Sequence, residues 1–215
     1  MSIGILLVDD HEIMREGLFA LLKKNNNLEV VGQASDGRVA VEMVHEISPD
    51  VVIMDIGMPN LNGIEATRLM LADHPKLKIM ALSTHSDGSI VAKMLKAGAS
   101  GYMLKDSAFV ELVDGINAMM EDKTYLCSRV AKIVFSDYVN LITNPKYAGG
   151  DNLTSRERQV LQLVAEGKTT KEIAPALHVS IKTIDSHREH IMEKLDIHNI
   201  AGLTKYAIRE GLTFL

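Results

Sequence analysis

Short apolar runs alternate with stretches of helical periodicity over the first 120 residues of the chain. The clearest run, Val51–Met54, lies between two turn signals and is typical of a strand buried on both faces of a parallel sheet. After each run, apolar residues recur at helical intervals, as at Met14, Leu18, Leu21 and Leu22. The predicted strands are Ile3–Val8, Val30–Ala34, Val51–Met54, Ile79–Ser83 and Ser100–Leu104.

Five strand–helix repeats predict the fold class of this region. Parallel strands joined by right-handed helical crossovers form a sheet that helices cover on both faces. We therefore expect an α/β domain over residues 1–120, with a doubly wound five-stranded parallel sheet in the flavodoxin-like order 2-1-3-4-5. An eight-stranded barrel is excluded because the repeats are too few.

The pattern changes after residue 120. Lys132–Ile142 has helical periodicity, and Asn144-Pro145 and Gly149-Gly150 then interrupt the chain. We interpret residues 121–152 as a linker that contains a helix, with Thr143–Asn152 exposed at the domain boundary.

Strand signals vanish in residues 153–215, where four short helical segments predict an all-α helix-turn-helix domain. Ser180 is the expected N-cap of the third of these helices. The segments contain Val160–Val164, Ile173–Leu177, Ile184–Leu195 and Ala201–Glu210.

Composition limits the class of protein and its compartment. A single cysteine, Cys127, excludes an intramolecular disulfide framework and is typical of a reducing compartment. The N-terminus has no basic segment before its apolar run, and no run approaches a membrane span, so we expect a soluble, cytoplasmic protein. Residues 1–150 carry 14 Lys+Arg against 19 Asp+Glu, whereas residues 151–215 carry 9 of each. Because this C-terminal part is neutral, charge alone does not predict nucleic-acid binding.

Polar residues stand where four of the predicted strands end. They are Asp9 and Asp10 after the first strand, Asp55 after the third, Ser83 in the fourth and Lys105 after the fifth. The carboxyl ends of parallel strands lie at one edge of a doubly wound sheet, so these groups are expected to converge. Three carboxylates together need a cation to remain ionised, and hard oxygen ligands favour Mg²⁺ over zinc. Asp55 is then a candidate nucleophile that forms an acyl phosphate, whose oxygens Ser83 and Lys105 would bind.

A structural role is the alternative for each of these residues taken singly. A strand-end aspartate is more often a helix cap or a turn former, and Asp9 or Asp10 suits the capping of the next helix. His11 is interpreted as a surface residue and not as a metal ligand. The occurrence of all five residues at the strand ends favours the functional interpretation.

Four motifs give this region a resemblance to a known family. They are Leu-Leu-Val-Asp-Asp-His (6–11), Met-Asp-Ile-Gly-Met-Pro (54–59), Ala-Leu-Ser-Thr (81–84) and Gly-Tyr-Met-Leu-Lys-Asp (101–106). Nearly the whole chain resembles a two-component response regulator of the NarL/LuxR type. The resemblance implies that a sensor histidine kinase phosphorylates Asp55. It also implies Mg²⁺ held by Asp10, Asp55 and the Gly57 carbonyl, with Asp9 completing the acidic cluster.

The resemblance further implies a switch pair. In such a pair the Ser83 hydroxyl moves toward the phosphoryl group and the Tyr102 ring turns inward, whereas the structural alternative for Tyr102 is ordinary packing. Three positions depart from the common pattern of the family: Gly57, Thr84 and Asp106. Gly57 lies where side chains in the family influence water access, and Thr84 stands where a smaller residue is common and would narrow the approach, so the lifetime of the acyl phosphate is left open.

The C-terminal part resembles a LuxR-type DNA-binding domain. Leu153–Leu161 matches the opening of that domain, and the pattern continues through Ile173-Ala174, Val179-Ser180 and Lys182-Thr183-Ile184. On a helical period, Ile184, Ile191 and Leu195 face the core, which leaves the opposite face for a major groove.

The expected contacts to double-stranded operator DNA fall into two groups. Phosphate contacts are assigned to Lys171, Lys182 and Arg188, although Arg188 has the alternative of lying along the core edge. The other candidates on the recognition helix are Thr183, Asp185, Ser186 and Glu189. A neutral domain predicts modest monomer affinity, so we expect a homodimer on phosphorylation or on DNA. Its contact would use Leu203, Tyr206, Ala207 and Ile208, unless these residues only close the small core.

Two other functions compete with a phosphorylation-switched transcription regulator. One is a phosphatase with an aspartyl nucleophile, but such enzymes place an Asp-x-Asp pair after the first strand, whereas Asp9 and Asp10 are adjacent. The other keeps the phosphoacceptor domain and makes the C-terminal part a protein-interaction module. We expect no enzyme beyond self-catalysed phosphoryl transfer to Asp55 and hydrolysis from it.

Overall fold

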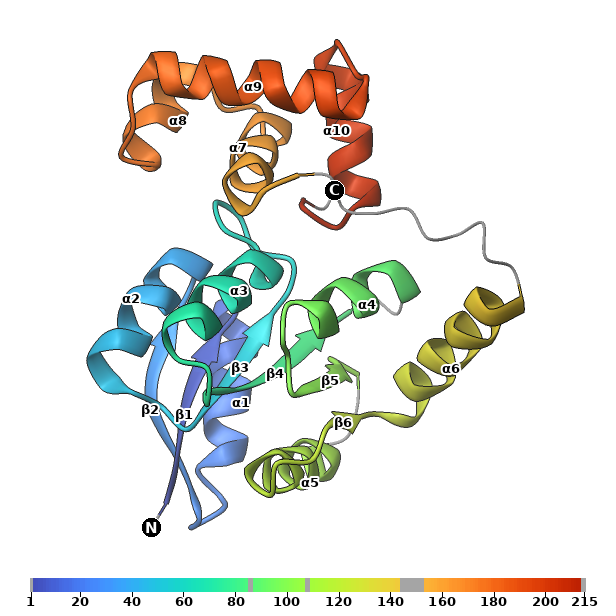
Figure 1. The fold of residues 1–215 in the computed structure, drawn as a ribbon. Helices are drawn as coiled ribbons and strands as arrows, with labels where there is room; N and C mark the ends of the chain where they lie inside the picture. Colours follow the sequence, from blue (N-terminus) through green and yellow to red (C-terminus); the bar gives the residue numbers. More distant parts are fainter. Residues whose placement is uncertain (1, 85–86, 107–108, 144–152, 214–215) are drawn as a thin grey trace.

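The computed structural model describes residues 2–84, 87–106, 109–143 and 153–213. A parallel sheet with helices on both faces forms the first part of the chain, and the last four helices lie as a module above one edge of it (Figure 1). The strands are β1 Ile3–Val8, β2 Leu28–Ala34, β3 Val51–Asp55, β4 Lys78–Ser83, β5 Gly101–Leu104 and β6 Tyr125–Leu126.

The sheet confirms the predicted class and adds one strand to it. All strand pairs are parallel, and the order is β2-β1-β3-β4-β5-β6. The sequence predicted five strands in the order 2-1-3-4-5 and missed β6. This strand pairs through Gly101 with Tyr125 and Tyr102 with Leu126, and two residues are too short to show a strand periodicity.

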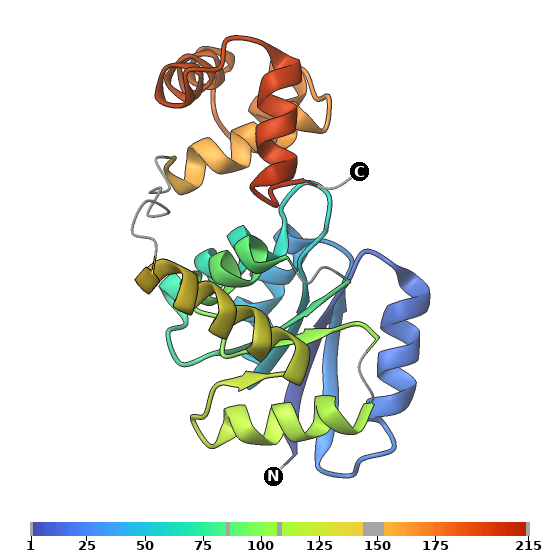
Figure 2. The same ribbon diagram turned by 90° about the vertical axis from the view of Figure 1, so that its right-hand side faces the viewer.

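Helices cover both faces of the sheet. On one face α2 packs on α3 and α3 on α4, whereas α1 and α5 lie on the other (Figure 2). Leu18 of α1 and Leu112 of α5 line one groove on that face. Burial on both faces explains why every residue of β3 is buried. These helices are α1 Glu12–Leu22, α2 Gly37–Ile47, α3 Gly63–Asp73, α4 Gly88–Lys96 and α5 Phe109–Met120.

The turn from β3 into α3 depends on close backbone packing. A Cβ on Gly63, the first residue of α3, would lie 2.1 Å from the Asp55 carbonyl oxygen, so only glycine allows this approach. Asn62 is the N-cap, and its Oδ1 accepts a hydrogen bond from the Glu65 amide at 3.0 Å. The loop between Asp55 and Asn62 is therefore held at both of its ends.

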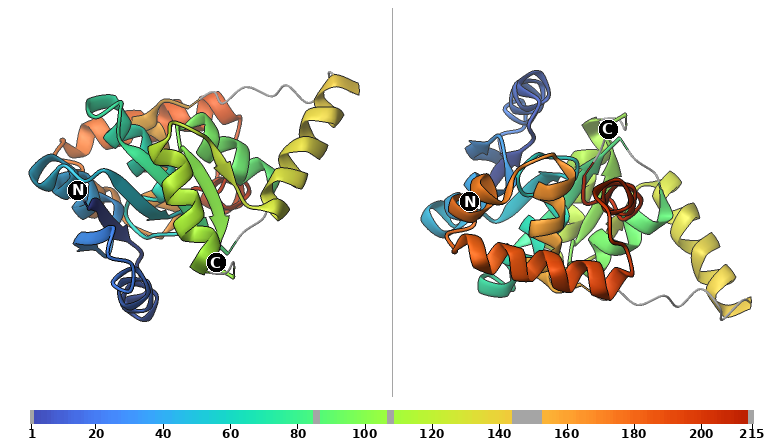
Figure 3. Two further views of the ribbon diagram at one scale, coloured as in Figure 1. Left: turned by 90° about the horizontal axis from the view of Figure 1, so that it is seen from below. Right: turned by 90° about the horizontal axis from the view of Figure 1, so that it is seen from above.

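The connection to the C-terminal module begins with a further helix, α6 Ser128–Thr143. It contacts α4 and lies beside the sheet in the views from below and above (Figure 3). The helix predicted within Lys132–Ile142 is part of it. The rest of the expected linker, residues 144–152, lies outside the described residues.

The C-terminal module contains the four predicted helices: α7 Ser155–Ala165, α8 Thr170–Ala176, α9 Ile181–Leu195 and α10 Ile200–Arg209. Its core contains Val160, Leu161, Ile184, Ile191 and Leu203. Thr154 and Glu157 form a capping box at the start of α7, and the Ser180 side chain caps α9 by accepting from the Thr183 amide. Among the described helices, none is long and apolar enough to cross a membrane.

Candidate functional site

The polar groups at the carboxyl ends of the strands converge as predicted. Register places Val8 opposite Met54 and Asp55 opposite Leu82, so β1, β3 and β4 end at one level. Ligand atoms of four residues lie within 4.8 Å of one another: Asp9, Asp10, His11 and Asp55. His11 lies at the surface, with its side chain 70% exposed, and its Nδ1 borders the cluster.

Lys105 connects two of the carboxylates. Its Nζ lies 2.6 Å from Asp9 Oδ2 and 3.0 Å from Asp55 Oδ2. The three side chains are nearly enclosed, so water screens these attractions less than it does at an exposed site.

Burial and charge set the protonation of this group. Burial raises the pKa of Asp55 above its ordinary value, the charge of Asp9 adds to the rise, and Lys105 opposes both effects. Burial alone would lower the pKa of Lys105, but its hydrogen bond to Asp9 and the charge of Asp55 outweigh that effect, and the pKa is raised. Lys105 therefore stays a cation at neutral pH.

The cluster has the donors that a hard divalent cation uses. Asp9 Oδ2 and Asp10 Oδ1 are both buried, with Lys105 Nζ 2.6 Å from the first and His11 Nδ1 2.8 Å from the second. A carboxylate oxygen has two lone pairs, so one nitrogen neighbour leaves room for a cation. Carboxylate oxygens that converge in this way fit a magnesium-like ion.

A cavity of about 400 Å³ opens beside Asp55. Its walls include the predicted residues Gly57, Thr84 and Lys105, but also Glu166 and Thr213 from the C-terminal module. Neither Glu166 nor Thr213 is predicted from the sequence, because both lie more than a hundred residues from Asp55 in the chain.

Ser83 and Tyr102 are joined by a side-chain hydrogen bond. Tyr102 is fully buried, so its ring already lies inside the domain. Burial raises the pKa of Tyr102 to about 12, and its side-chain hydrogen bond to Ser83 acts in the opposite direction. The two predicted switch residues are therefore in direct contact.

In the C-terminal module, α9 presents a polar face to solvent. Lys182, Thr183, Asp185, Ser186 and Glu189 are all exposed there, while Ile184 and Ile191 are buried beneath them. The helix lies on the side of the module away from the sheet (Figures 1 and 2). The predicted separation of a buried core face from an exposed polar face is therefore present.

Two predicted phosphate contacts lie at the edge of this surface. Lys171 is exposed on α8. Arg188 is partly buried, and its Nη1 donates to Thr170 Oγ1 at 2.9 Å, which joins α9 to α8. On the last helix, Leu203 and Ala207 are buried in the core of the module, which is the structural alternative considered for them.

Comparison with known families agrees with this division of the chain. Residues 5–117 match the family described as response regulator receiver domain. Residues 151–207 match bacterial regulatory proteins of the luxR family. The chain is a response regulator of the NarL/LuxR type.

Relatives of this response regulator match over its whole length. The transcriptional regulatory protein LiaR of Bacillus subtilis is 40% identical over 210 residues, covering 98% of this chain and 99% of the relative. The response regulator UvrY of Escherichia coli is 36% identical over 211 residues, covering 98% and 95%. RcsB from Salmonella enterica serovar Typhimurium, bound to a promoter with a phosphomimetic, is 26% identical with a TM-score of 0.63, covering 99% of this chain and 100% of RcsB.

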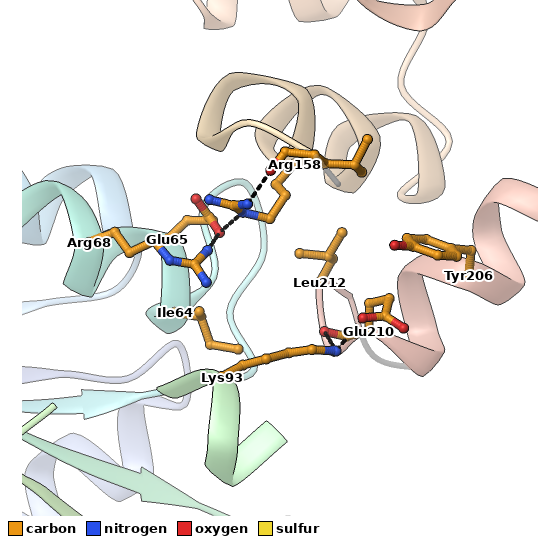
Figure 4. Close-up of a pocket in the computed structure, with 9 residues that line it drawn as sticks. Ile64, Glu65, Arg68, Lys93, Arg158, Tyr206, Glu210 and Leu212 are labelled. Atoms are coloured by element: carbon orange, nitrogen blue, oxygen red, sulfur yellow. Dashed lines mark hydrogen bonds and ion pairs between the residues drawn. The ribbon is translucent and has the colours of Figure 1, made fainter. Parts of the chain in front are cut away.

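The receiver and the DNA-binding domain of this response regulator share a polar interface. Glu65 of α3 is fully buried, and its carboxylate accepts hydrogen bonds from Arg68 and Arg158 (Figure 4). It also accepts one from the Ser155 hydroxyl. Lys93 of α4 bonds both the carbonyl and the carboxylate of Glu210 at the end of α10 (Figure 4). The space among these side chains is about 10 Å³, the lower limit for one water molecule.

A second part of the interface holds the loop that follows Asp55. Gln162 Oε1 accepts from the Asn62 amide at 3.1 Å and from Asn62 Nδ2 at 2.9 Å. Gln162 Nε2 donates to the Met58 carbonyl at 3.2 Å. The sequence analysis missed this contact because single polar residues on α7 and in a loop carry no periodic signal that pairs them.

Proposed function

We propose that Asp55 is the phosphoacceptor of this response regulator and that phosphorylation controls DNA binding and dimerisation. The observation that carries the proposal is the meeting of Asp55 with Asp9 and Lys105 in a cavity open to a phosphodonor. Asp55 Oδ2 attacks phosphorus, the bond from phosphorus to the donor breaks, and an acyl phosphate forms. The natural donor is the phosphohistidine of a sensor kinase, as the receiver family implies.

The receiver's own residues prepare this transfer. Lys105 offsets the charge of Asp55 before attack and is placed to bind an oxygen of the phosphoryl group afterwards. Ser83, whose strand ends beside β3, supplies a hydroxyl donor to a second oxygen. Transfer and hydrolysis are self-catalysed single events, so the protein acts as a regulator and not as a turnover enzyme.

Mg²⁺ fits the acidic cluster as the resident cation. Asp9, Asp10 and Asp55 would hold it together with the Gly57 carbonyl, and the carboxylate oxygens of these three residues lie within 4.8 Å of one another. The ion supplies charge neutralisation for the phosphoryl oxygens. The phosphatase alternative is not favoured, because the family is one of transcription regulators.

The DNA-binding domain reads an operator with α9. Lys171, Lys182 and Arg188 are assigned to phosphates, and Thr183, Asp185, Ser186 and Glu189 to the groove. A homodimer on two half-sites compensates for the neutral charge of the domain, and RcsB has been solved as dimers on DNA. A regulator that binds the chromosome acts in the cytoplasm.

Phosphorylation of the full-length protein with acetyl phosphate and Mg²⁺ tests the assignment. Asp55→Asn is expected to abolish the added mass of one phosphoryl group. Asp73→Asn changes an exposed carboxylate at the far end of α3 from the cluster, so it leaves labelling intact. Persistent labelling of the Asp55 variant would overturn the assignment.

A further inference from the structure

Two histidines meet at the edge of the receiver opposite the acidic cluster. His45 lies in the last turn of α2, and His74 is the C-cap of α3, which packs beside α2 (Figure 1). Asp73 and His74 border a cavity of about 440 Å³ that Asp50 and Lys78 also line. Because Asp50 precedes β3 and Lys78 begins β4, this cavity lies at the amino ends of the strands, whereas the acidic cluster lies at their carboxyl ends.

The two histidine rings face each other through one nitrogen of each. His45 Nδ1 and His74 Nε2 are 3.0 Å apart, and the ring centroids are 4.7 Å apart with their planes inclined at 57°. At that separation the two nitrogens either share one proton or direct their lone pairs toward a common cation. Two imidazole nitrogens bound to one zinc ion at about 2.0–2.1 Å with a tetrahedral angle are about 3.3–3.4 Å apart, so a shift of about 0.3–0.4 Å would complete the site.

A carboxylate orients the first of these rings. Asp73 Oδ2 lies 3.6 Å from Nε2 of His45, which is the ring nitrogen that does not face His74. Negative charge there favours a proton on Nε2, which leaves the Nδ1 lone pair available for a metal. A carboxylate placed behind a histidine in this way is typical of metal sites, where it fixes the tautomer and the orientation of the ring.

The type of donor favours a transition metal over magnesium. Imidazole nitrogen suits Zn²⁺, Cu²⁺ and Ni²⁺, whereas Mg²⁺ prefers oxygen ligands such as those of the acidic cluster. Lys78, which lines the cavity, forms an ion pair with Asp122, so its charge is balanced beside the site. The His45 side chain is 47% exposed, so water molecules can supply the remaining ligands of a bound ion.

We propose that His45 and His74 form a binding site for a divalent transition-metal ion of the zinc type, with solvent completing the coordination. Such an ion would tie the end of α2 to the turn between α3 and β4. The two histidines are 29 residues apart in the chain, so the ion binds the folded receiver more tightly than the unfolded chain. It would therefore stabilise the fold as its concentration rises.

The zinc affinity of the full-length, metal-depleted protein tests the site. A chromophoric chelator competes for Zn²⁺, and excess Mg²⁺ is present to compete at the acidic cluster. We expect His45→Gln and His74→Gln each to weaken zinc binding by about tenfold or more, because each removes one of the two nitrogen ligands. Equal affinity in both variants and the wild type overturns the proposal.

His198→Gln is the matched control. His198 is an exposed histidine of the DNA-binding domain, and its Nε2 lies 3.3 Å from Asp196 Oδ1, so it has a carboxylate neighbour as His45 does. We expect this variant to keep the zinc affinity of the wild type. A loss as large as that of His74→Gln would show that any surface histidine beside a carboxylate suffices, and it overturns the proposal.

The chemical shifts of the ring nitrogens give a second measurement, which identifies the ligand atoms. Long-range proton–nitrogen correlation spectra of the full-length protein separate the two nitrogens of each histidine. We expect Zn²⁺ to shift the signals of His45 Nδ1 and His74 Nε2, and Mg²⁺ to shift neither. Zinc-dependent shifts confined to His11, which borders the acidic cluster, would place the ion there and overturn the proposal.

Discussion

Asn62 and Gln162 form a buried amide pair between the receiver and the DNA-binding domain. Neither side chain is exposed, and Gln162 Oε1 accepts from the Asn62 amide nitrogen and from its Nδ2. Asn62 Nδ2 also donates to the carbonyl of Leu212 at 3.1 Å. A buried amide is stable only where all of its hydrogen-bond partners are present. The Asn62–Gln162 pair therefore stabilises this docked arrangement of the two domains.

Truncation of Gln162 is expected to open the protein. Gln162→Ala leaves the Met58 carbonyl and the Asn62 side chain without these hydrogen bonds, at a cost of about 1–3 kcal/mol for each buried group. Water can form hydrogen bonds with these groups when the domains separate. The variant therefore shifts the equilibrium toward separated domains. Small-angle scattering should show a larger radius of gyration than in the wild type.

Gln159→Ala is the control for this change. Gln159 lies on the same helix, but its side chain accepts a hydrogen bond from Arg156 of its own domain. Its variant is expected to keep the radius of gyration of the wild type. Equal compactness of both variants would show that Gln162 does not hold the domains together.

Removal of the Lys105 charge should impair phosphorylation without unfolding the receiver. Lys105→Met leaves Asp9 and Asp55 without their shared cation, so the pKa of Asp55 rises further. We expect the initial rate with acetyl phosphate to fall by about tenfold or more, because a donor to the phosphoryl oxygens is also lost. The rate is followed by intact mass at several Mg²⁺ concentrations, with Lys96→Met, on the surface helix α4, as the control. Equal rates in both variants would contradict the role of Lys105.

Tyr102 is expected to remain protonated far above the ordinary pKa of tyrosine. Its folded pKa of about 12 exceeds the value of 10.0, so its contribution to stability is complete below pH 10 and is lost as the pH rises through 12. Burial also raises the pKa of Tyr125, so the test of Tyr102 is a group that titrates near pH 12 in the tyrosinate absorbance of the folded protein. Tyr102→Phe should remove that group and lower the free energy of unfolding by about 1 kcal/mol through the lost hydrogen bond to Ser83. A group that still titrates near pH 12 in the variant would contradict the assignment.

Lys182 is expected to contribute to DNA affinity uniformly across sequences. It is exposed near the N-terminus of α9, so Lys182→Ala should weaken binding and reduce the salt dependence by about one phosphate contact. The probe is a genomic DNA fragment that is recovered bound to the protein. Gel shifts with this fragment at several salt concentrations measure how the affinity depends on salt. Lys205→Ala, an exposed lysine on α10, is the matched control. An unchanged slope for Lys182→Ala would remove it from the set of phosphate contacts.

The local sequence determined the elements and the polar groups of the acidic site around Asp55. Five of the six strands and the four C-terminal helices follow from periodicity and turn residues, because burial on one or two faces imposes a repeat that a single chain displays. The convergence of Asp9, Asp55 and Lys105 follows from the same strand pattern, since the ends of parallel strands share one edge. The short β6 was missed because two residues display no repeat.

Only the tertiary structure decided how the two domains meet. Gln162 and Glu166 stand on α7 and at its end as ordinary polar residues, yet one spans the loop after Asp55 and the other lines its cavity. Hydrogen bonds between residues about a hundred positions apart depend on the docking of whole domains, which no local pattern of polar residues encodes. The sequence thus predicted the acidic cluster at Asp55 and the polar face of α9, and the packing of α7 on the loop after Asp55 decided which of the two lies against the other domain.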